Sequence, residues 1–250
     1  MTIRGILFDK DGTLVDFNKT WFAIGDRLAL DAAGGDRDRA DGLMDLAGYD
    51  FALGRFRPDS TFAAGTNADI VGLWYPTMAP KVRAELVERF NRFTATEGAL
   101  CAVAVDGALD AIRTLHGNGY RLGVATNDST GGAAQTLLML GVSQMFTAAY
   151  GYDAVARPKP APDTIHAFCD LTGLGPGEIA MVGDNRHDLE MAHAGGAGLA
   201  IAVLSGTGTR ERLEPMADVV LGSVAELPGF LAEIASDVSV GGSPARTGRN

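Results

Sequence analysis

The sequence predicts an α/β fold in which a parallel sheet is flanked by helices and carries an inserted all-helical cap. Three observations support this prediction. Short apolar runs recur along the chain, segments with helical spacing separate most of them, and a long stretch after the first run breaks the alternation. Short apolar strands that alternate with helices are typical of parallel βαβ units whose sheet is buried on both faces. The expected strands are 6–8, 122–125, 148–150, 179–182, 199–203 and 219–221, and the expected helices between them are 107–116, 129–140, 161–171 and 187–194.

The stretch that breaks the alternation divides the chain into domains. It contains helical patterns at 20–30 and 82–94, with a loop-like segment between them and no convincing strand pattern. The economical interpretation is a helical domain inserted between the first and second strands of the sheet. The end of the chain is rich in Ser, Gly and Arg, a composition typical of a flexible tail. The expected divisions are a core domain of 1–16 and 105–235, a helical cap of 17–104 and a tail of 236–250.

The composition makes some classes of binding partner unexpected. The 250 residues are 46% hydrophobic and 21% charged, with a formal net charge of -10. An acidic surface repels phosphate backbones and anionic lipids, so nucleic acid and membranes are not expected partners. The two cysteines, Cys101 and Cys169, have no spacing that predicts a disulfide framework or a zinc site. No apolar run approaches the roughly 18 residues of a membrane span. The N-terminus lacks the features of a signal peptide, so we expect a cytoplasmic protein.

Polar residues stand where four of the expected strands end. Ligands of open parallel sheets bind beyond the carboxyl ends of the strands, so these residues are expected to converge at one edge of the sheet. Each residue taken alone could equally be a helix cap or a turn former. Together they are far more typical of a functional site. They are Asp9 and Asp11 after the first strand, Thr126, Asn127 and Asp128 after the second, Lys159 after the third and Asp184 after the fourth.

This set has the chemistry of phosphoryl transfer. Asp9, Asp11 and Asp184 supply hard oxygen ligands of the kind that Mg²⁺ prefers, and Asp11 could use either its carboxylate or its backbone carbonyl. The Thr126 hydroxyl, backbone amides near it and the Lys159 ammonium could hold the oxygens of a phosphoryl group. Phosphoryl transfer depends chiefly on positioning and on neutralised charge, which such a site provides.

The same residues carry a family resemblance. The segment Asp9-Lys10-Asp11-Gly12-Thr13-Leu14 resembles the DxDGT motif of the haloacid dehalogenase-like (HAD) superfamily. Thr126-Asn127, Lys159, and Gly183-Asp184 with Asp188 resemble its three later motifs, in the family's order and over about residues 4 to 235. The resemblance implies a HAD-like, Rossmann-like core. The helical insertion directly after the first motif is similar to the C1 cap of phosphoglycolate phosphatase-like members.

The resemblance also implies roles for these residues. Asp9 would be the nucleophile that forms an aspartyl-phosphate, and Asp11 the general acid and base. Thr126, Asn127 and Lys159 would bind the phosphoryl group. Asp9, Asp11 and Asp184 would bind Mg²⁺, and Asp188 would orient a metal-bound water or Lys159. The implied substrate is a small phosphorylated metabolite.

Three other features have a structural interpretation at least as good as a functional one. Lys10 is expected to point away from Asp9 and Asp11, as alternate residues of an extended segment do, and to be structural or peripheral. His187 is more typical of a cap or surface group than of a catalytic one. Arg55 and Arg57 could meet an anionic substrate tail or lie in a solvated loop.

The expected function is Mg²⁺-dependent hydrolysis of a small phosphomonoester, phosphoglycolate or similar, through a phospho-aspartyl intermediate on Asp9. The acid at Asp11 favours a phosphatase over a dehalogenase, since a halide leaving group needs no proton. Two alternatives stay open. One is a sugar-phosphate mutase similar to β-phosphoglucomutase, and the other is a non-catalytic regulatory protein on the same scaffold. Either a monomer or a homodimer is compatible with the sequence.

Overall fold

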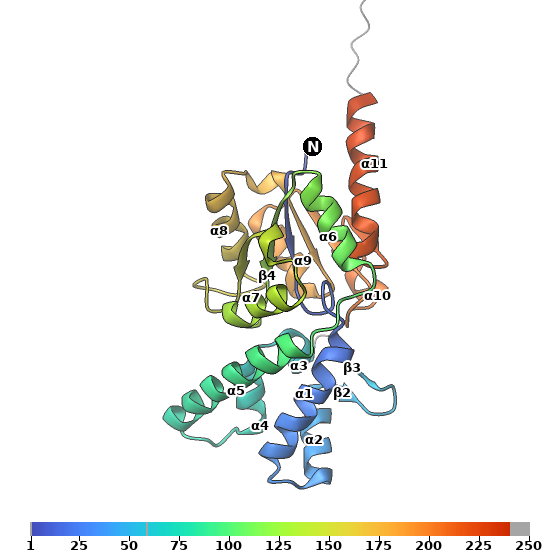
Figure 1. The fold of residues 1–250 in the computed structure, drawn as a ribbon. Helices are drawn as coiled ribbons and strands as arrows, with labels where there is room; N and C mark the ends of the chain where they lie inside the picture. Colours follow the sequence, from blue (N-terminus) through green and yellow to red (C-terminus); the bar gives the residue numbers. More distant parts are fainter. Residues whose placement is uncertain (1, 59, 241–250) are drawn as a thin grey trace, which may run out of the picture.

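The computed structural model describes residues 2–58 and 60–240, and its centre is a six-stranded parallel sheet of strand order β5-β4-β1-β6-β7-β8 (Figure 1). The sheet confirms the α/β prediction, and each expected strand is present with ends shifted by at most two residues. The strands are β1 (Gly5–Phe8), β4 (Arg121–Ala125), β5 (Phe146–Tyr150), β6 (Ile179–Gly183), β7 (Leu199–Val203) and β8 (Val219–Leu221).

Helices cover both faces of the sheet, which explains why its strands are mainly apolar. In β1, Ile6 and Phe8 belong to one hydrophobic cluster and Leu7 to another, because successive side chains of a strand point to opposite faces. Helices α6 (Ala108–Gly117), α7 (Thr130–Met139) and α11 (Leu227–Val240) contribute to the first cluster. Helices α8 (Asp163–Thr172), α9 (Arg186–Gly195) and α10 (Arg210–Leu213) contribute to the second.

The insertion between β1 and β4 forms a separate helical layer below the core (Figure 1). It has its own hydrophobic cluster, which includes Trp21, Phe56, Phe62 and Trp74. Its helices are α1 (Phe17–Ala32), α2 (Arg37–Ala47), α3 (Thr61–Ala64), α4 (Asn67–Trp74) and α5 (Pro80–Leu100).

The cap also contains a short antiparallel hairpin that the sequence analysis did not predict. Its strands are β2 (Tyr49–Asp50) and β3 (Arg55–Phe56). The turn forms because Asp50 Oδ1 accepts hydrogen bonds from the backbone of Ala52 and Leu53, and because Gly54 adopts a φ of 64°. Strands of two residues are too short to show alternation, so the segment resembled a loop.

The two connections between core and cap run side by side. Asp16 N donates to Val103 O at 2.8 Å, and Val105 N donates to Leu14 O at 3.0 Å. Val15 also forms an isolated bridge with Asp11. The cap is therefore attached to the core only a few residues from Asp9 and Asp11.

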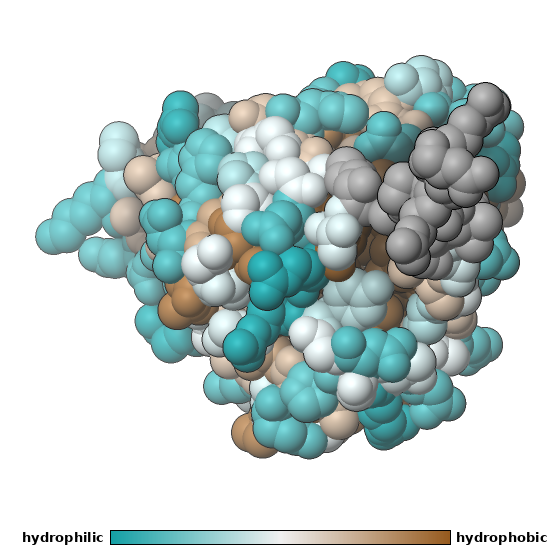
Figure 2. Space-filling view, turned by 90° about the horizontal axis from the view of Figure 1, so that it is seen from above, coloured by the Kyte–Doolittle hydropathy of each residue, from teal (hydrophilic) through white to brown (hydrophobic). Residues whose placement is uncertain are grey.

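The end of the chain differs from the prediction of a tail from residue 236. Helix α11 continues to Val240, so residues 236–240 are helical. The helix is held to the core by buried Leu227 and Leu231, and its last turns continue from this anchored part. Residues 241–250 lie outside the described residues. Figure 2 views the core from the side opposite the cap, where polar residues cover most of the surface. None of the helices in the described ranges is long and apolar enough to cross a membrane.

Candidate active site

Residues from neighbouring strands meet at the carboxyl edge of the sheet, where the cap covers them. Strand β1 lies between β4 and β6, so Asp9 stands between Thr126 and Asp184. A cavity between core and cap is lined by Asp9, Asp11, Thr126, Asn127, Asp128, Lys159, Asn185, His187 and Asp188 from the core, and by Phe17, Trp21, Phe62, Ala63, Ala64, Gly65, Thr66, Asn67 and Ile70 from the cap.

Lys159 connects two of the buried acids. Its Nζ lies 2.7 Å from Asp9 Oδ1 and 2.6 Å from Asp188 Oδ1, and all three side chains are buried. Burial alone would lower the pKa of Lys159, but the two carboxylates outweigh it and raise the pKa above its ordinary value. Asp188 is held in turn by the backbone N–H of Asn185, which donates to its Oδ2 at 3.0 Å. The contact with Lys159 is one of the two roles expected for Asp188.

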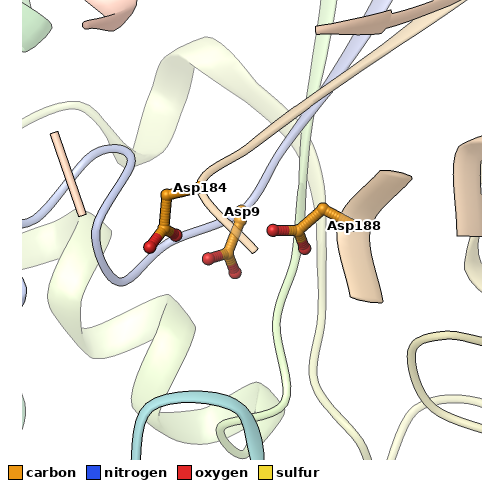
Figure 3. A group of neighbouring side chains, drawn as sticks. All are labelled: Asp9, Asp184 and Asp188. Carbon is orange, nitrogen blue, oxygen red and sulfur yellow. The ribbon is translucent and has the colours of Figure 1, made fainter. Parts of the chain in front are cut away.

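Three carboxylates form a compact cluster (Figure 3). Asp9, Asp184 and Asp188 each have an oxygen within 4.8 Å of the other two. Burial and the charge of Asp188 raise the pKa of Asp9 against the opposing effect of Lys159. Burial, followed by the charges of Asp9 and Asp188, raises the pKa of Asp184 well above its ordinary value. Asp184 Oδ2 accepts a hydrogen bond from Thr207 N at 2.8 Å, and no ion pair within residues 2–58 and 60–240 includes Asp184.

Three glycines without side chains leave room for the carboxylates of Asp184 and Asp188. A Cβ at Gly206 would overlap Asp184 Oδ2, and one at Gly183 would overlap the Asp188 carboxylate. Gly12 has a φ of 91°, a conformation that side chains rarely adopt, and a Cβ there would lie 2.5 Å from Asp184 Cγ. The cluster is thus buried, rich in hard oxygen donors and short of positive charge. These properties fit a divalent metal ion, whose charge would offset the repulsion among the acids.

The side chain of Asp11 is engaged in a different network from the one expected. Its Oδ1 accepts a hydrogen bond from Trp21 Nε1 at 2.5 Å, and its Oδ2 lies 2.7 Å from Lys10 Nζ. In the acid cluster Asp188 stands where a carboxylate of Asp11 was expected. Asp11 was expected to reach a cation through either its carboxylate or its backbone carbonyl. Its carboxylate is already engaged with Trp21 and Lys10.

The expected orientation of Lys10 is wrong. Its side chain is 2% exposed, and its Nζ lies 2.7 Å from Asp11, 3.1 Å from Asp128 and 5.2 Å from the centre of the Trp21 ring. The alternation of a strand does not apply, because β1 ends at Phe8 and the chain turns. Burial would lower the pKa of Lys10, but Asp11 and Asp128 raise it.

The residues after β4 join the core to the cap. Thr126 Oγ1 accepts a hydrogen bond from Asp128 N at 3.1 Å. Asn127 Nδ2 donates to Ala64 O of the cap at 3.1 Å and to Lys159 O at 3.4 Å. Both protons of this side-chain amide are thus used.

Sequence reasoning missed several residues of the site. Trp21 and Phe62 were missed because the cap domain has no sequence motif of its own. Asn185 was missed because it resembles an ordinary N-cap residue of a helix. Asn127 Oδ1, Asn185 Nδ2 and His187 Nδ1 are buried without a hydrogen-bond partner among the described residues, and these three side chains line the cavity. Arg55 and Arg57 do not line it, and Arg57 pairs with Asp45 at 2.9 Å.

Comparisons with known proteins agree with this geometry. Residues 3–196 match the haloacid dehalogenase-like hydrolase family. The chain is 30% identical over 213 residues to the phosphoglycolate phosphatase of Salmonella typhimurium, covering 78% of this chain and 79% of that protein. It is 25% identical over 226 residues to the pyrophosphatase PpaX of Bacillus pumilus, covering 90% and 95%.

Solved structures show the same fold. The crystal structure of a predicted phosphoglycolate phosphatase from Haemophilus somnus superposes with a TM-score of 0.70 at 20% identity, covering 92% of this chain and 98% of that one. CbbY from Rhodobacter sphaeroides, solved in complex with phosphate, gives a TM-score of 0.64 at 21% identity, covering 90% and 96%. With the family match over most of the chain, the chain belongs to the haloacid dehalogenase-like hydrolases.

Proposed function

We propose that this protein is a Mg²⁺-dependent phosphatase that hydrolyses a small phosphomonoester through a phospho-aspartyl intermediate on Asp9. The observation that carries the proposal is the buried group of Asp9, Lys159 and Asp188 with Asp184 beside it, open to a cavity under the cap. The names of the relatives as phosphoglycolate phosphatase and pyrophosphatase support phosphate chemistry.

The first half-reaction transfers the phosphoryl group to the enzyme. A carboxylate oxygen of Asp9 forms a bond to phosphorus while the bond to the leaving alcohol breaks. Asp11 gives its proton to the departing oxygen. Lys159 Nζ, the Thr126 hydroxyl and the backbone N–H of Asn127 hold the phosphoryl oxygens. Lys159 is already fixed by Asp188, so it needs little reorganisation to do so.

The second half-reaction regenerates Asp9. Asp11 takes a proton from a water molecule, whose oxygen bonds to phosphorus as the bond to Asp9 breaks, and inorganic phosphate leaves. We propose that Asp9, Asp184 and the backbone carbonyl of Asp11 hold Mg²⁺, which offsets the negative charge shared by Asp9 and the phosphoryl group.

The test compares Asp9→Asn with a matched acid far from the cavity. Asp110, on α6 and 85% exposed, provides the control variant Asp110→Asn. Phosphate release from a panel of phosphate esters is measured with Mg²⁺ and with a chelator. We expect Asp9→Asn and chelation each to abolish release and Asp110→Asn to leave it unchanged.

Product analysis completes the test. Rapid quenching of the parent protein is expected to yield one phosphoryl group on the peptide that contains Asp9. An Asp9→Asn protein that turns over at the parent rate would contradict the mechanism. An isomerised sugar phosphate in place of free phosphate would indicate a mutase.

A further inference from the structure

The cap side of the cavity is chemically different from the core side. We call it the cap wall. Its members are Phe17, Trp21, Phe62, Ala63, Ala64, Gly65, Thr66, Asn67 and Ile70. Aromatic and aliphatic carbon provides most of this wall.

The polar side-chain donors of the cap wall are already committed. Trp21 Nε1 donates to Asp11, and the Thr66 hydroxyl donates to Asp69 Oδ2 at 2.7 Å. Asn67 Nδ2 donates to Asn91 Oδ1 at 2.9 Å and to Thr94 Oγ1 at 2.8 Å. An anionic group on the substrate would therefore have to displace an existing hydrogen bond to gain a side-chain partner here.

The charges around the cavity also disfavour a second anion. Four carboxylates line it, on Asp9, Asp11, Asp128 and Asp188. Lys10 and Lys159 are each held between two of these carboxylates. Among the described residues, no arginine lines the cavity.

The N-terminus of α4, the usual place for an anion on a helix, is also occupied. Thr66 caps this helix in a capping box, and the backbone N–H of Thr66 donates to Asp69 Oδ2 at 2.7 Å. The carboxylate of Asp69 thus already supplies the negative charge that the helix dipole favours. A substrate anion placed there would be repelled by Asp69.

In the part of the chain that the structure describes, the unpartnered polar atoms on the core side of the cavity include one amide acceptor, Asn127 Oδ1, and one amide donor, Asn185 Nδ2. Asn127 lines the cavity, and its amide orientation is defined because Nδ2 donates to two carbonyl oxygens. Its Oδ1 is buried without a partner among the described residues. A hydroxyl group can donate to Asn127 Oδ1 and can also accept from a donor such as Asn185 Nδ2, whereas a carboxylate can only accept and would be repelled by Asn127 Oδ1.

We propose that the alcohol released at this site is uncharged, with an apolar face against the cap wall, and that esters with a second anionic group, phosphoglycolate included, are disfavoured. This inference rests on the proposed phosphatase function.

Two esters of equal length test it directly. 2-Phosphoglycolate and 2-hydroxyethyl phosphate differ in having a carboxylate or a hydroxymethyl group at the same position. We expect kcat/KM for 2-hydroxyethyl phosphate to exceed that for 2-phosphoglycolate by at least about tenfold, because the carboxylate must be desolvated without a partner. We also expect 2-hydroxyethyl phosphate to have the lower dissociation constant of the two esters from the Asp9→Asn protein, measured by calorimetry.

A charge placed on the cap wall should reduce the preference for 2-hydroxyethyl phosphate. Ala63→Lys puts a cation on α3 in the cavity lining, and we expect it to raise the ratio of phosphoglycolate to hydroxyethyl phosphate efficiency by about tenfold. Leu46→Lys is the matched control, since Leu46 is 54% exposed on α2 and does not line the cavity. It adds the same charge to the cap, and the ratio should stay at the parent value.

The outcomes separate the two proposals. If phosphoglycolate is hydrolysed as fast as hydroxyethyl phosphate or faster, the substrate inference is overturned and the phosphatase function stands. If Ala63→Lys and Leu46→Lys change the ratio equally, long-range attraction explains the effect and the cap wall does not determine selectivity. If no ester of the panel releases phosphate with Mg²⁺ present, the phosphatase function itself fails.

Discussion

Replacing Lys10 by methionine tests whether the buried lysine between two carboxylates stabilises the fold. Lys10 Nζ lies 2.7 Å from Asp11 and 3.1 Å from Asp128, and the three side chains are at most 13% exposed. Methionine fills a similar volume but leaves two buried carboxylates facing each other without a cation. Breaking a buried ion pair by removing one partner costs about 3–5 kcal/mol, because the remaining charge stays buried.

Lys19→Met provides the matched control. Lys19 Nζ lies 2.9 Å from Asp16, an equally close contact, but the lysine side chain is 63% exposed. An exposed pair contributes about 0–1 kcal/mol. The two variants therefore separate the effect of burial from that of the contact itself.

The free energy of unfolding is measured by urea titration followed by far-UV circular dichroism. With a slope of about 2 kcal/mol per molar urea, the expected loss lowers the midpoint of Lys10→Met by roughly 1.5–2.5 M. Adding Asp128→Asn removes one of the two facing charges and should recover part of the loss. If Lys10→Met loses no more than Lys19→Met, then Asp11 and Asp128 do not depend on Lys10, and the stabilising role assigned to it is refuted.

Three further predictions concern Asp184 and Asp11. Burial raises the pKa of Asp184, so between the ordinary and the raised pKa the folded protein binds more protons than the unfolded chain. The melting temperature of the metal-free protein should therefore fall as the pH rises through this range, and Asp184→Asn should make that fall less steep. Gly206→Ala, which brings a Cβ against Asp184, should raise the Mg²⁺ concentration for half-maximal activity by about tenfold, whereas Gly177→Ala, with open space around it, should not. Trp21→Phe removes the hydrogen bond to Asp11 and should slow the hydrolysis of alkyl phosphates about tenfold more than that of p-nitrophenyl phosphate, because the nitrophenolate leaving group needs no proton. Equal slowing of both substrates would contradict a role of Trp21 in proton transfer.

The core could be predicted from the sequence because its signals are local. Strands β1, β4 and β6 are short, mostly buried apolar runs, and a polar residue directly follows each of them. The carboxyl ends of parallel strands meet by geometry alone, so Asp9, Thr126 and Asp184 could be assigned to one site before any contact was known. The cap hairpin was missed because two-residue strands carry no periodic signal.

The errors at the site share a physical cause. The orientation of Lys10 was inferred from strand alternation, yet Leu14 N and Val15 N both donate to Lys10 O in a turn just after β1. Gly206 lies after β7, a strand whose end has no polar motif. The need for a glycine there is clear only from the structure, in which Asp184 lies directly beside it. Such contacts join segments far apart in the chain, and no spacing rule encodes them.

The same distinction explains why selectivity and chemistry are encoded differently in this chain. In the proposed mechanism Asp9 and Lys159 act on the phosphoryl group, which is identical in every phosphomonoester, and both residues follow strands of the sheet. In the proposed site the cap would meet the part of the substrate that varies. Trp21 lines the cavity from the cap, and its indole both packs in the cap core and donates to Asp11. A shift of the cap that suits a different alcohol would therefore also move the donor that holds Asp11. Substrate preference and proton transfer are coupled through one side chain, so a cap variant that changes selectivity should change leaving-group dependence as well.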